Sequence, residues 1–266
     1  MGFIVLLIFL IGIIVVIKNN KKQNNKLPEY FNSNSLQATY QLIFEATVED
    51  IERWLKNGSL PKSHFYEELK DRDVLIIFTW IQDTSEQGKE KLRLLQKFEF
   101  DINKTTSSGK NAAMDYIDGM DPLYWFKQES EKNIPEEKYH NADFFTNELL
   151  YFKTIGLDFS KLDNLNRSVF YYAFKTIIKK DIKVYPNLLF ICDEIIKVFS
   201  LTPNLADIAF LLMKDFDVST GEQILRKYYT NEERNQLGTV FNEAKENALI
   251  DDAKHKLLEK LLKVND

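Results

Sequence analysis

The stretch Asp158-Phe-Ser-Lys-Leu-Asp-Asn-Leu-Asn-Arg-Ser-Val-Phe-Tyr-Tyr-Ala173 repeats the pattern of an earlier one, Asp101-Ile-Asn-Lys-Thr-Thr-Ser-Ser-Gly-Lys-Asn-Ala-Ala-Met-Asp-Tyr116. In each copy an Asp is followed two residues later by Asn or Ser, and eight residues later by Gly or Asn with a Lys or Arg after it. An apolar helical start then follows. A recurring turn-then-helix unit is typical of stacked repeat proteins, which act by presenting a surface.

The residues around the two copies predict more helices and no sheet. Apolar residues recur with a period near 3.6, while alternating stretches with hairpin turns are lacking. Thr47 and Thr230 begin capping-box patterns, and Asn57-Gly58 predicts a helix end. Helices are expected near 36–44, 51–56, 64–70, 73–82, 86–98, 121–126, 143–155, 167–179, 187–199, 204–214, 221–229, 231–247 and 250–263. The charged segment 127–142 is the candidate for an inserted loop.

The amino terminus predicts a single transmembrane anchor. Residues 2–17 contain only Gly, Phe, Ile, Val and Leu, and as a helix they would reach roughly 24 Å, which flanking side chains can extend. A cleaved secretion signal is the competing interpretation, but positive charge follows the run instead of preceding it, at Lys18, Lys21, Lys22 and Lys26. We therefore expect an anchor at 1–18 with its N-terminus outside, a Lys/Asn-rich tether at 19–35 and a cytoplasmic body.

Charge and cysteine content narrow the function of the body. Setting aside the four tether lysines leaves 31 of the 35 basic residues against 40 acidic ones, a balance near −9. Such a balance argues against nucleic-acid binding and favours a protein partner with a basic surface. Cys192 is the only cysteine, so an internal disulfide is excluded.

No residue pattern predicts catalysis, a cofactor or a metal. Gly109-Lys110 lacks the upstream Gly and the following Ser or Thr of a phosphate-binding loop. Cys192 lies in an apolar stretch that predicts a buried thiol. The three histidines, His64, His140 and His255, are far apart, and the aspartates 115, 118 and 121 lack the spacing of a calcium loop. We therefore do not expect an enzyme.

The repeated stretch resembles the ankyrin repeat. The second copy matches that pattern at Gly156, Asp158, Asp163, Arg167 and Ala173, and the first copy at Asp101, Asn103, Gly109 and Lys110. The start of a third copy is suggested by the segment from Leu211-Leu212 to Asp217-Val218-Ser219. The spacing is irregular, since the leading aspartates lie 57 and 59 residues apart and not ~33. The resemblance implies an all-α fold with an ankyrin-like helical-repeat solenoid at 36–220, followed by a helical C-terminal cap at 221–266.

Two runs of aromatic residues are the candidate partner-binding positions. Tyr124-Trp125-Phe126 and Phe170-Tyr171-Tyr172 each place three rings in succession, which cannot all face one side of a helix. Exposed Tyr and Trp are typical of interface hot spots, so Tyr124, Trp125, Tyr171 and Tyr172 are proposed to contact a partner. Core packing is the alternative explanation for each ring.

Together these features predict a membrane-anchored module that binds a protein through a helical-repeat groove. An immunity or antitoxin protein is one specific form of this hypothesis, by analogy of architecture. The alternative is a structural scaffold or adaptor that localises a complex to the membrane.

Overall fold

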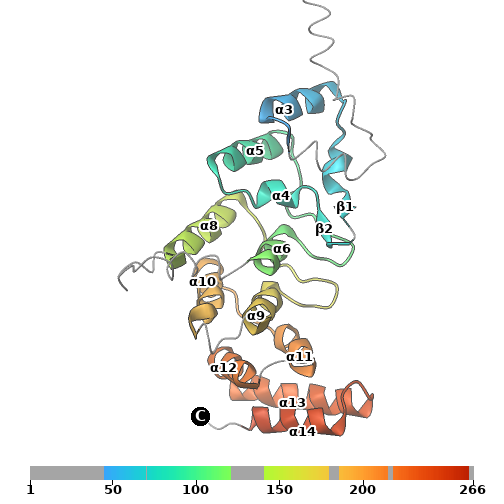
Figure 1. The fold of residues 1–266 in the computed structure, drawn as a ribbon, viewed down its shortest axis with the longest axis vertical. Coiled ribbons are helices and arrows are strands. Elements are labelled where there is room, and N and C mark those ends of the chain that lie inside the picture. The colour runs from blue at the N-terminus through green and yellow to red at the C-terminus, as the bar shows by residue number, and fades with distance from the viewer. Residues whose placement is uncertain (1–44, 70, 121–140, 180–185, 215–217, 264–266) are drawn as a thin grey trace, which may run out of the picture. The chain divides into compact units, whose positions relative to one another are not determined.

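The computed structural model describes residues 45–69, 71–120, 141–179, 186–214 and 218–263 (Figure 1). The chain divides into two compact units, the first ending at Ile102 and the second beginning at Asn103. The predicted anchor at 1–18, the tether at 19–35, the helix at 36–44 and the segment 121–140 lie outside the described residues. Among the helices that are described, none is both long and apolar enough to cross a membrane.

The first unit places helices around a small aromatic core. Its elements are α3 (Val48–Asn57), the 3-10 helix η1 (Lys62–Tyr66), β1 (Glu68–Leu69), β2 (Val74–Leu75), α4 (Phe78–Ile81) and α5 (Glu86–Lys97). The buried Phe65 ring meets Trp80 edge-on at 5.4 Å and Phe100 at 4.9 Å. As predicted, Thr47 caps α3, and the helix ends at Gly58, whose φ is 73°.

At residues 64–75 the structure differs from two of the predicted helices. The helix predicted at 64–70 is present only as the end of η1, and the one predicted at 73–82 only as α4. Between them the chain forms an antiparallel pair with Glu68 opposite Leu75 and Leu69 opposite Val74. Beyond the pair, the amide of Ile77 donates to the carbonyl of Phe65 at 2.8 Å, which brings two apolar runs together. The expectation of no sheet is therefore wrong for this short hairpin, because long-range packing outweighs local helical preference.

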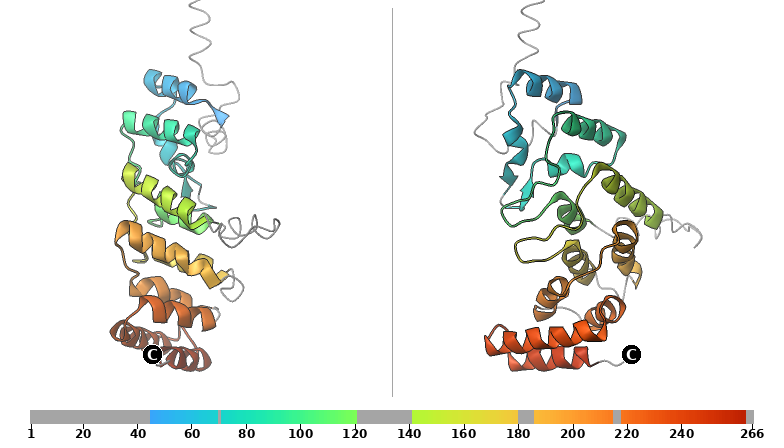
Figure 2. Two further views of the ribbon diagram at one scale, coloured as in Figure 1. Left: turned by 90° about the vertical axis from the view of Figure 1, so that its left-hand side faces the viewer. Right: turned by 180° about the vertical axis from the view of Figure 1, so that it is seen from behind.

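The elements of the second unit, within its described residues, are all helices joined by loops and turns. Its elements are α6 (Ala112–Gly119), α8 (Asn141–Ile155), α9 (Val169–Lys179), η3 (Pro186–Leu189), α10 (Phe190–Phe199), α11 (Leu205–Met213), α12 (Val218–Tyr228), α13 (Asn231–Glu246) and α14 (Asp252–Leu262). Helix α9 packs against α6 and α11, and α11 packs against α13. Helix α8 packs against α10, and Figure 2 shows these two side by side.

The mostly helical class predicted from the sequence is confirmed. The capping box at Thr230 is present at the start of α13. The predicted array at 36–220 runs across both units, and its boundary with the cap at 221–266 falls inside α12.

Candidate interaction surface

The two sequence copies form the same turn. We call residues 103–111 turn 1 and residues 160–168 turn 2; equivalent positions are 57 residues apart. In turn 1 the amide of Thr106 donates to the carbonyl of Lys110 at 2.9 Å, and in turn 2 the amide of Asp163 donates to that of Arg167 at 2.9 Å. The residue before each basic residue is left-handed, with φ of 89° at Gly109 and 58° at Asn166.

Each turn leads directly into a helix. Asn111 precedes α6, and its side-chain oxygen accepts from the amide of Met114 at 3.0 Å. Ser168, its equivalent, precedes α9, and its hydroxyl accepts from the amide of Phe170 at 3.1 Å. The turn followed by a helix is therefore present in both copies, because both carry a left-handed residue and a polar cap at the same spacing.

Turn 2 lies directly on turn 1. The Asn164 amide and side chain donate to the carbonyls of Ser108 at 3.0 Å and Ser107 at 2.8 Å. A Cβ added to Gly109 would lie 2.7 Å from the backbone nitrogen of Asn164. The approach is so close that glycine is required at this position for space as well as for its φ.

Side chains of turn 1 also hold the chain just before turn 2. Asn103 donates to the carbonyl of Gly156 at 2.9 Å and accepts from the amide of Asp158 at 2.8 Å. Asn111 donates to the carbonyl of Asp158 at 2.7 Å while it caps α6. These bonds satisfy backbone groups of the loop that no helix or strand partners.

A carboxylate organises turn 2. The Asp163 side chain is fully buried and accepts from the amides of Leu165 at 2.8 Å and Arg167 at 3.0 Å. It also accepts from the Arg167 guanidinium at 2.7 Å and the Tyr172 hydroxyl at 3.0 Å. Burial opposes ionisation, but these hydrogen bonds outweigh it and hold the pKa of Asp163 below its usual value.

Turn 1 has a hydroxyl as its internal acceptor, and its cation pairs with carboxylates outside the turn. At the position equivalent to Asp163, the Thr106 hydroxyl accepts from the amide of Lys110 at 3.2 Å. The buried Lys110 ammonium pairs with Asp115 at 2.8 Å and Asp118 at 3.2 Å, both on α6. Asp118 also accepts from Lys175 of α9 at 2.6 Å. Burial opposes the charge of Asp118, but the two lysines outweigh it and lower its pKa.

A second buried carboxylate joins α9 to α11. Asp207 accepts from the Ser168 hydroxyl at 2.7 Å, from the Ser168 amide and from the amide of Asn204 at 2.8 Å. The Asn204 side chain in turn donates to the carbonyl of Asn166 at 3.2 Å. Burial raises the pKa of Asp207 to about 6, despite these hydrogen bonds. The start of α11 is therefore tied to the end of turn 2.

The aromatic residues proposed to bind a partner are not exposed where the structure describes them. Tyr124 and Trp125 lie outside the described residues. Tyr171 and Tyr172 are only 7% and 4% exposed, so the expectation of exposed rings at these positions is wrong. Helix α9 has α6, α10, α11 and α12 as neighbours, and successive rings can therefore be buried on different sides. The Tyr171 ring lies 4.0 Å from the Arg167 guanidinium.

Two exposed leucines of turn 2 were not recognised in the sequence. Leu162 is 47% exposed and Leu165 is 58% exposed, and they stand at positions equivalent to Thr105 and Ser108 of turn 1. The signal was available: two apolar residues interrupt a turn whose first copy is polar at both places. These leucines, with the polar residues of the two turns, form the candidate interaction surface.

The cysteine and the described histidines have the surroundings of ordinary structural residues. Cys192 is buried on α10, as predicted, and burial raises the pKa of its thiol. His255 is buried and contacts the Asn242 side-chain oxygen at 2.7 Å. His64 contacts Glu67, and His140 lies outside the described residues. Within the described part of the chain, no three His, Cys, Asp or Glu side chains gather as metal ligands would.

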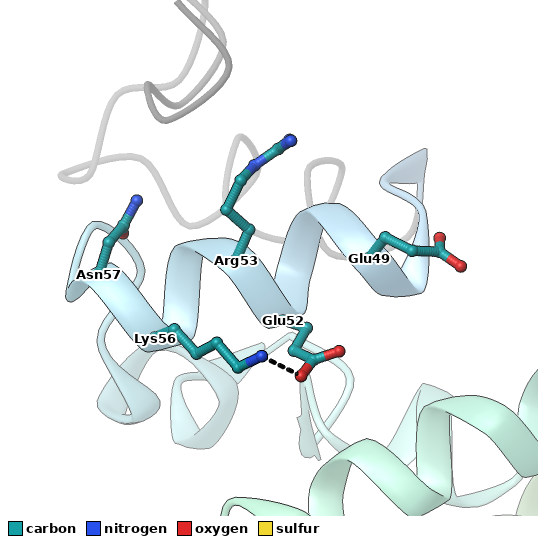
Figure 3. A pocket seen from close by; sticks show the side chains of 5 residues that line it. All are labelled: Glu49, Glu52, Arg53, Lys56 and Asn57. Carbon is teal, nitrogen blue, oxygen red and sulfur yellow. Dashed lines mark ion pairs between the residues drawn. The ribbon is translucent and has the colours of Figure 1, made fainter. Parts of the chain in front are cut away.

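An open hollow on the first unit is formed by one helix. Figure 3 shows its lining side chains, which all come from α3: Glu49, Glu52, Arg53, Lys56 and Asn57. Hydrogen bonds from Lys56 and Lys97 lower the pKa of Glu52 to about 2, and each ammonium lies 2.6 Å from its carboxylate. Ion pairs along a solvated helix face contribute little to stability, and we assign no function to this hollow.

Comparison with known proteins does not identify the chain. No family model, no curated protein and no solved structure matches it.

Proposed function

We propose that this chain is a protein-binding module built from stacked turn-and-helix units and held at a membrane through residues 2–17. The observation that carries the proposal is the register of 57 residues between turn 1 and turn 2. Equal hydrogen bonds form at equal positions, and each turn leads into a helix that packs on the next. Units that stack in this way expose one edge of loops and helix starts, which suits recognition of another macromolecule.

The packing of the second unit supports an irregular solenoid of the ankyrin-like kind. Helix α6 packs on α9, and α9 packs on α11. Helices α8 and α10 pack on each other, and α10 also contacts α9. The link from Asp207 to Ser168 extends the stacking beyond the second copy. In this proposal the departures from a ~33-residue period are long connections between units.

The reactive side chains Lys110 and Cys192 have structural surroundings, which favours binding over catalysis. Lys110 is buried between Asp115 and Asp118, and Cys192 is buried in α10. The acidic body would attract a partner with a basic surface. An immunity or antitoxin protein is the specific form we propose, because such a protein needs one dedicated partner.

Crosslinking in native membranes tests this function. The tagged full-length chain would be crosslinked, purified in detergent and analysed by mass spectrometry. We expect one stoichiometric protein partner, and we expect loss of the chain to be toxic only when that partner is present. Many substoichiometric partners would favour a scaffold or adaptor, and the absence of any protein partner would contradict the proposal.

Fractionation of a chain lacking residues 2–17 tests the membrane anchor. We expect the full-length chain in the membrane fraction and the shortened chain, folded, in the soluble fraction. A shortened chain that stays with the membrane would place the attachment elsewhere, and one that aggregates would indicate that the apolar segment packs on the body.

A further inference from the structure

We propose that Leu162 and Leu165 are the anchors of the interface, and that they enter an apolar pocket on the partner protein. This inference rests on the proposed function and names the part of the surface that makes the contact. The two side chains are among the large apolar residues that stand exposed in the described part of the chain. They lie three positions apart in one turn.

The fold does not require leucine at either position. Turn 1 forms the same backbone hydrogen bonds with Thr105 and Ser108 at the equivalent places. Leucine at 47% and 58% exposure loses about half of the benefit of burial that such a side chain brings to a core. Neither the shape of turn 2 nor the core of the second unit therefore accounts for the pair.

The turn holds the leucines in place before any partner arrives. The amide of Leu165 donates to the buried Asp163 carboxylate, which also binds the Arg167 amide and guanidinium. Asn164, between the two leucines, is fixed on the carbonyls of Ser107 and Ser108. An ordered loop loses little conformational freedom on binding, so burial of its apolar side chains is expressed as affinity.

The charges near the leucines favour a protein over a lipid surface. The Lys161 ammonium donates to the carbonyl of Asn103, and the Arg167 guanidinium pairs with Asp163. Both cations are therefore engaged within the chain and are not offered to lipid phosphates. The net charge of −5 also opposes approach to an anionic membrane surface. The fitting occupant is a protein pocket that is apolar at its centre and polar at its rim.

The test replaces the leucines with the residues that turn 1 carries. The variant is Leu162→Thr with Leu165→Ser in the full-length chain, and the control is Leu249→Ser, at a leucine that is 71% exposed between α13 and α14. A photo-crosslinking residue at position 162, or at 249 as its control, identifies the contact in native membranes. Affinity for the captured protein is then measured with the purified full-length chains in detergent.

We expect one protein to crosslink from position 162 and not from 249. Its affinity should fall at least tenfold in the double variant and stay unchanged in Leu249→Ser, while the melting temperature of both variants matches the parent chain. If a protein is captured but the double variant binds it as tightly as the parent, the leucine anchor is wrong and the proposed function stands.

Other occupants of the leucines would also overturn the inference. Crosslinks to lipid, or liposome binding that the double variant loses, would assign the pair to a membrane. Crosslinks to residues 121–140 of the same chain, or to a second copy, would assign it to the protein itself. If the parent chain captures no protein at all, both the inference and the proposed function fail.

Discussion

Turn 1 and turn 2 share one backbone but are held by different side-chain chemistry. Both close with an amide-to-carbonyl bond of 2.9 Å, and both place a left-handed residue before a cation. Turn 1 uses the Thr106 hydroxyl as its internal acceptor, whereas turn 2 uses the Asp163 carboxylate. The comparison shows that the backbone depends on a few positions, and that the remaining positions are free to serve neighbours or partners.

The cations of the two turns differ in what they bind. Lys110 reaches carboxylates on the helix that follows, Asp115 and Asp118. Arg167 stays within its own turn, on Asp163, and stacks on the Tyr171 ring. A planar guanidinium suits a pair that combines hydrogen bonds with stacking, and a compact ammonium suits a site between two carboxylates. Turn 1 is therefore tied to α6 through the charge of its cation, whereas turn 2 is tied to α9 through the Tyr171 ring and the Tyr172 hydroxyl.

The largest expected effect comes from removing the acceptor of each turn. Asp163→Ala should lower the free energy of unfolding by about 3–4 kcal/mol, because it leaves two amides, a hydroxyl and a partly buried guanidinium without their acceptor. Thr106→Ala should cost about 1 kcal/mol, since it removes one neutral hydroxyl, which accepts from the Lys110 amide and contacts the Ser108 hydroxyl. Urea unfolding of the full-length chain in detergent measures both.

Asp163→Thr serves as the matched control, because it gives turn 2 the acceptor of turn 1 and removes the charge together with the oxygen that accepts from Arg167 and Tyr172. Its cost should lie between the other two. Equal costs for Asp163→Ala and Thr106→Ala would show that the charged network adds nothing to turn 2.

The second effect is a pH dependence of stability, which we expect at the start of α9 and not at the start of α6. Asn111 ties the start of α6 to the carbonyl of Asp158 and does not titrate, whereas Ser168 is tied to Asp207. The pKa of Asp207 is raised to about 6 in the folded chain, against about 4 when unfolded. The folded state therefore binds this proton more tightly, and the associated stability is full below pH ~4 and lost as pH rises through ~6.

Asp207→Asn should remove that dependence. Relative to the variant, the parent chain should lose about 2 kcal/mol of unfolding free energy between pH 4 and pH 7. Urea unfolding at several pH values measures the difference, and hydrogen exchange at the start of α9 locates it. A difference that does not change with pH, or that grows in the opposite direction, would show that Asp207 stays ionised in the folded chain. The variant retains Asp163 and Tyr229, two residues that interact electrostatically with Asp207.

The helical class and several helix ends could be predicted because they depend on local chemistry. Thr47, Thr230 and Gly58 act within a few residues of their own positions, and their types alone indicate a cap or a stop. The hairpin at 68–75 could not be predicted in this way. It depends on contacts such as that of Ile77 with Phe65, which local propensity does not describe.

The candidate site was predictable in position but not in its residues. The repeat pointed to the turns and the helix starts, but the tyrosines at 171 and 172 were chosen because successive aromatics were expected to leave one ring exposed. Burial on several sides of α9 defeats that argument. The two leucines stand out when the copies are aligned position by position, but their exposure depends on the packing around turn 2, which the sequence alone does not describe.

The smallest effect tests how tightly the turns stack. Gly109 and Gly156 both have positive φ, 89° and 81°, so alanine at either position carries a backbone cost of about 1 kcal/mol. A Cβ at Gly156 would meet nothing within 4 Å, whereas one at Gly109 would meet the backbone of Asn164. Gly109→Ala should therefore lower the unfolding free energy by about 2 kcal/mol more than Gly156→Ala. Because the contact joins turn 1 to turn 2, hydrogen exchange should rise at the amides of Asn164 and Gly109 in the first variant only. Equal costs for the two variants would mean that turn 2 can move away from turn 1, and the leucines would then lose the fixed platform on which their proposed role depends.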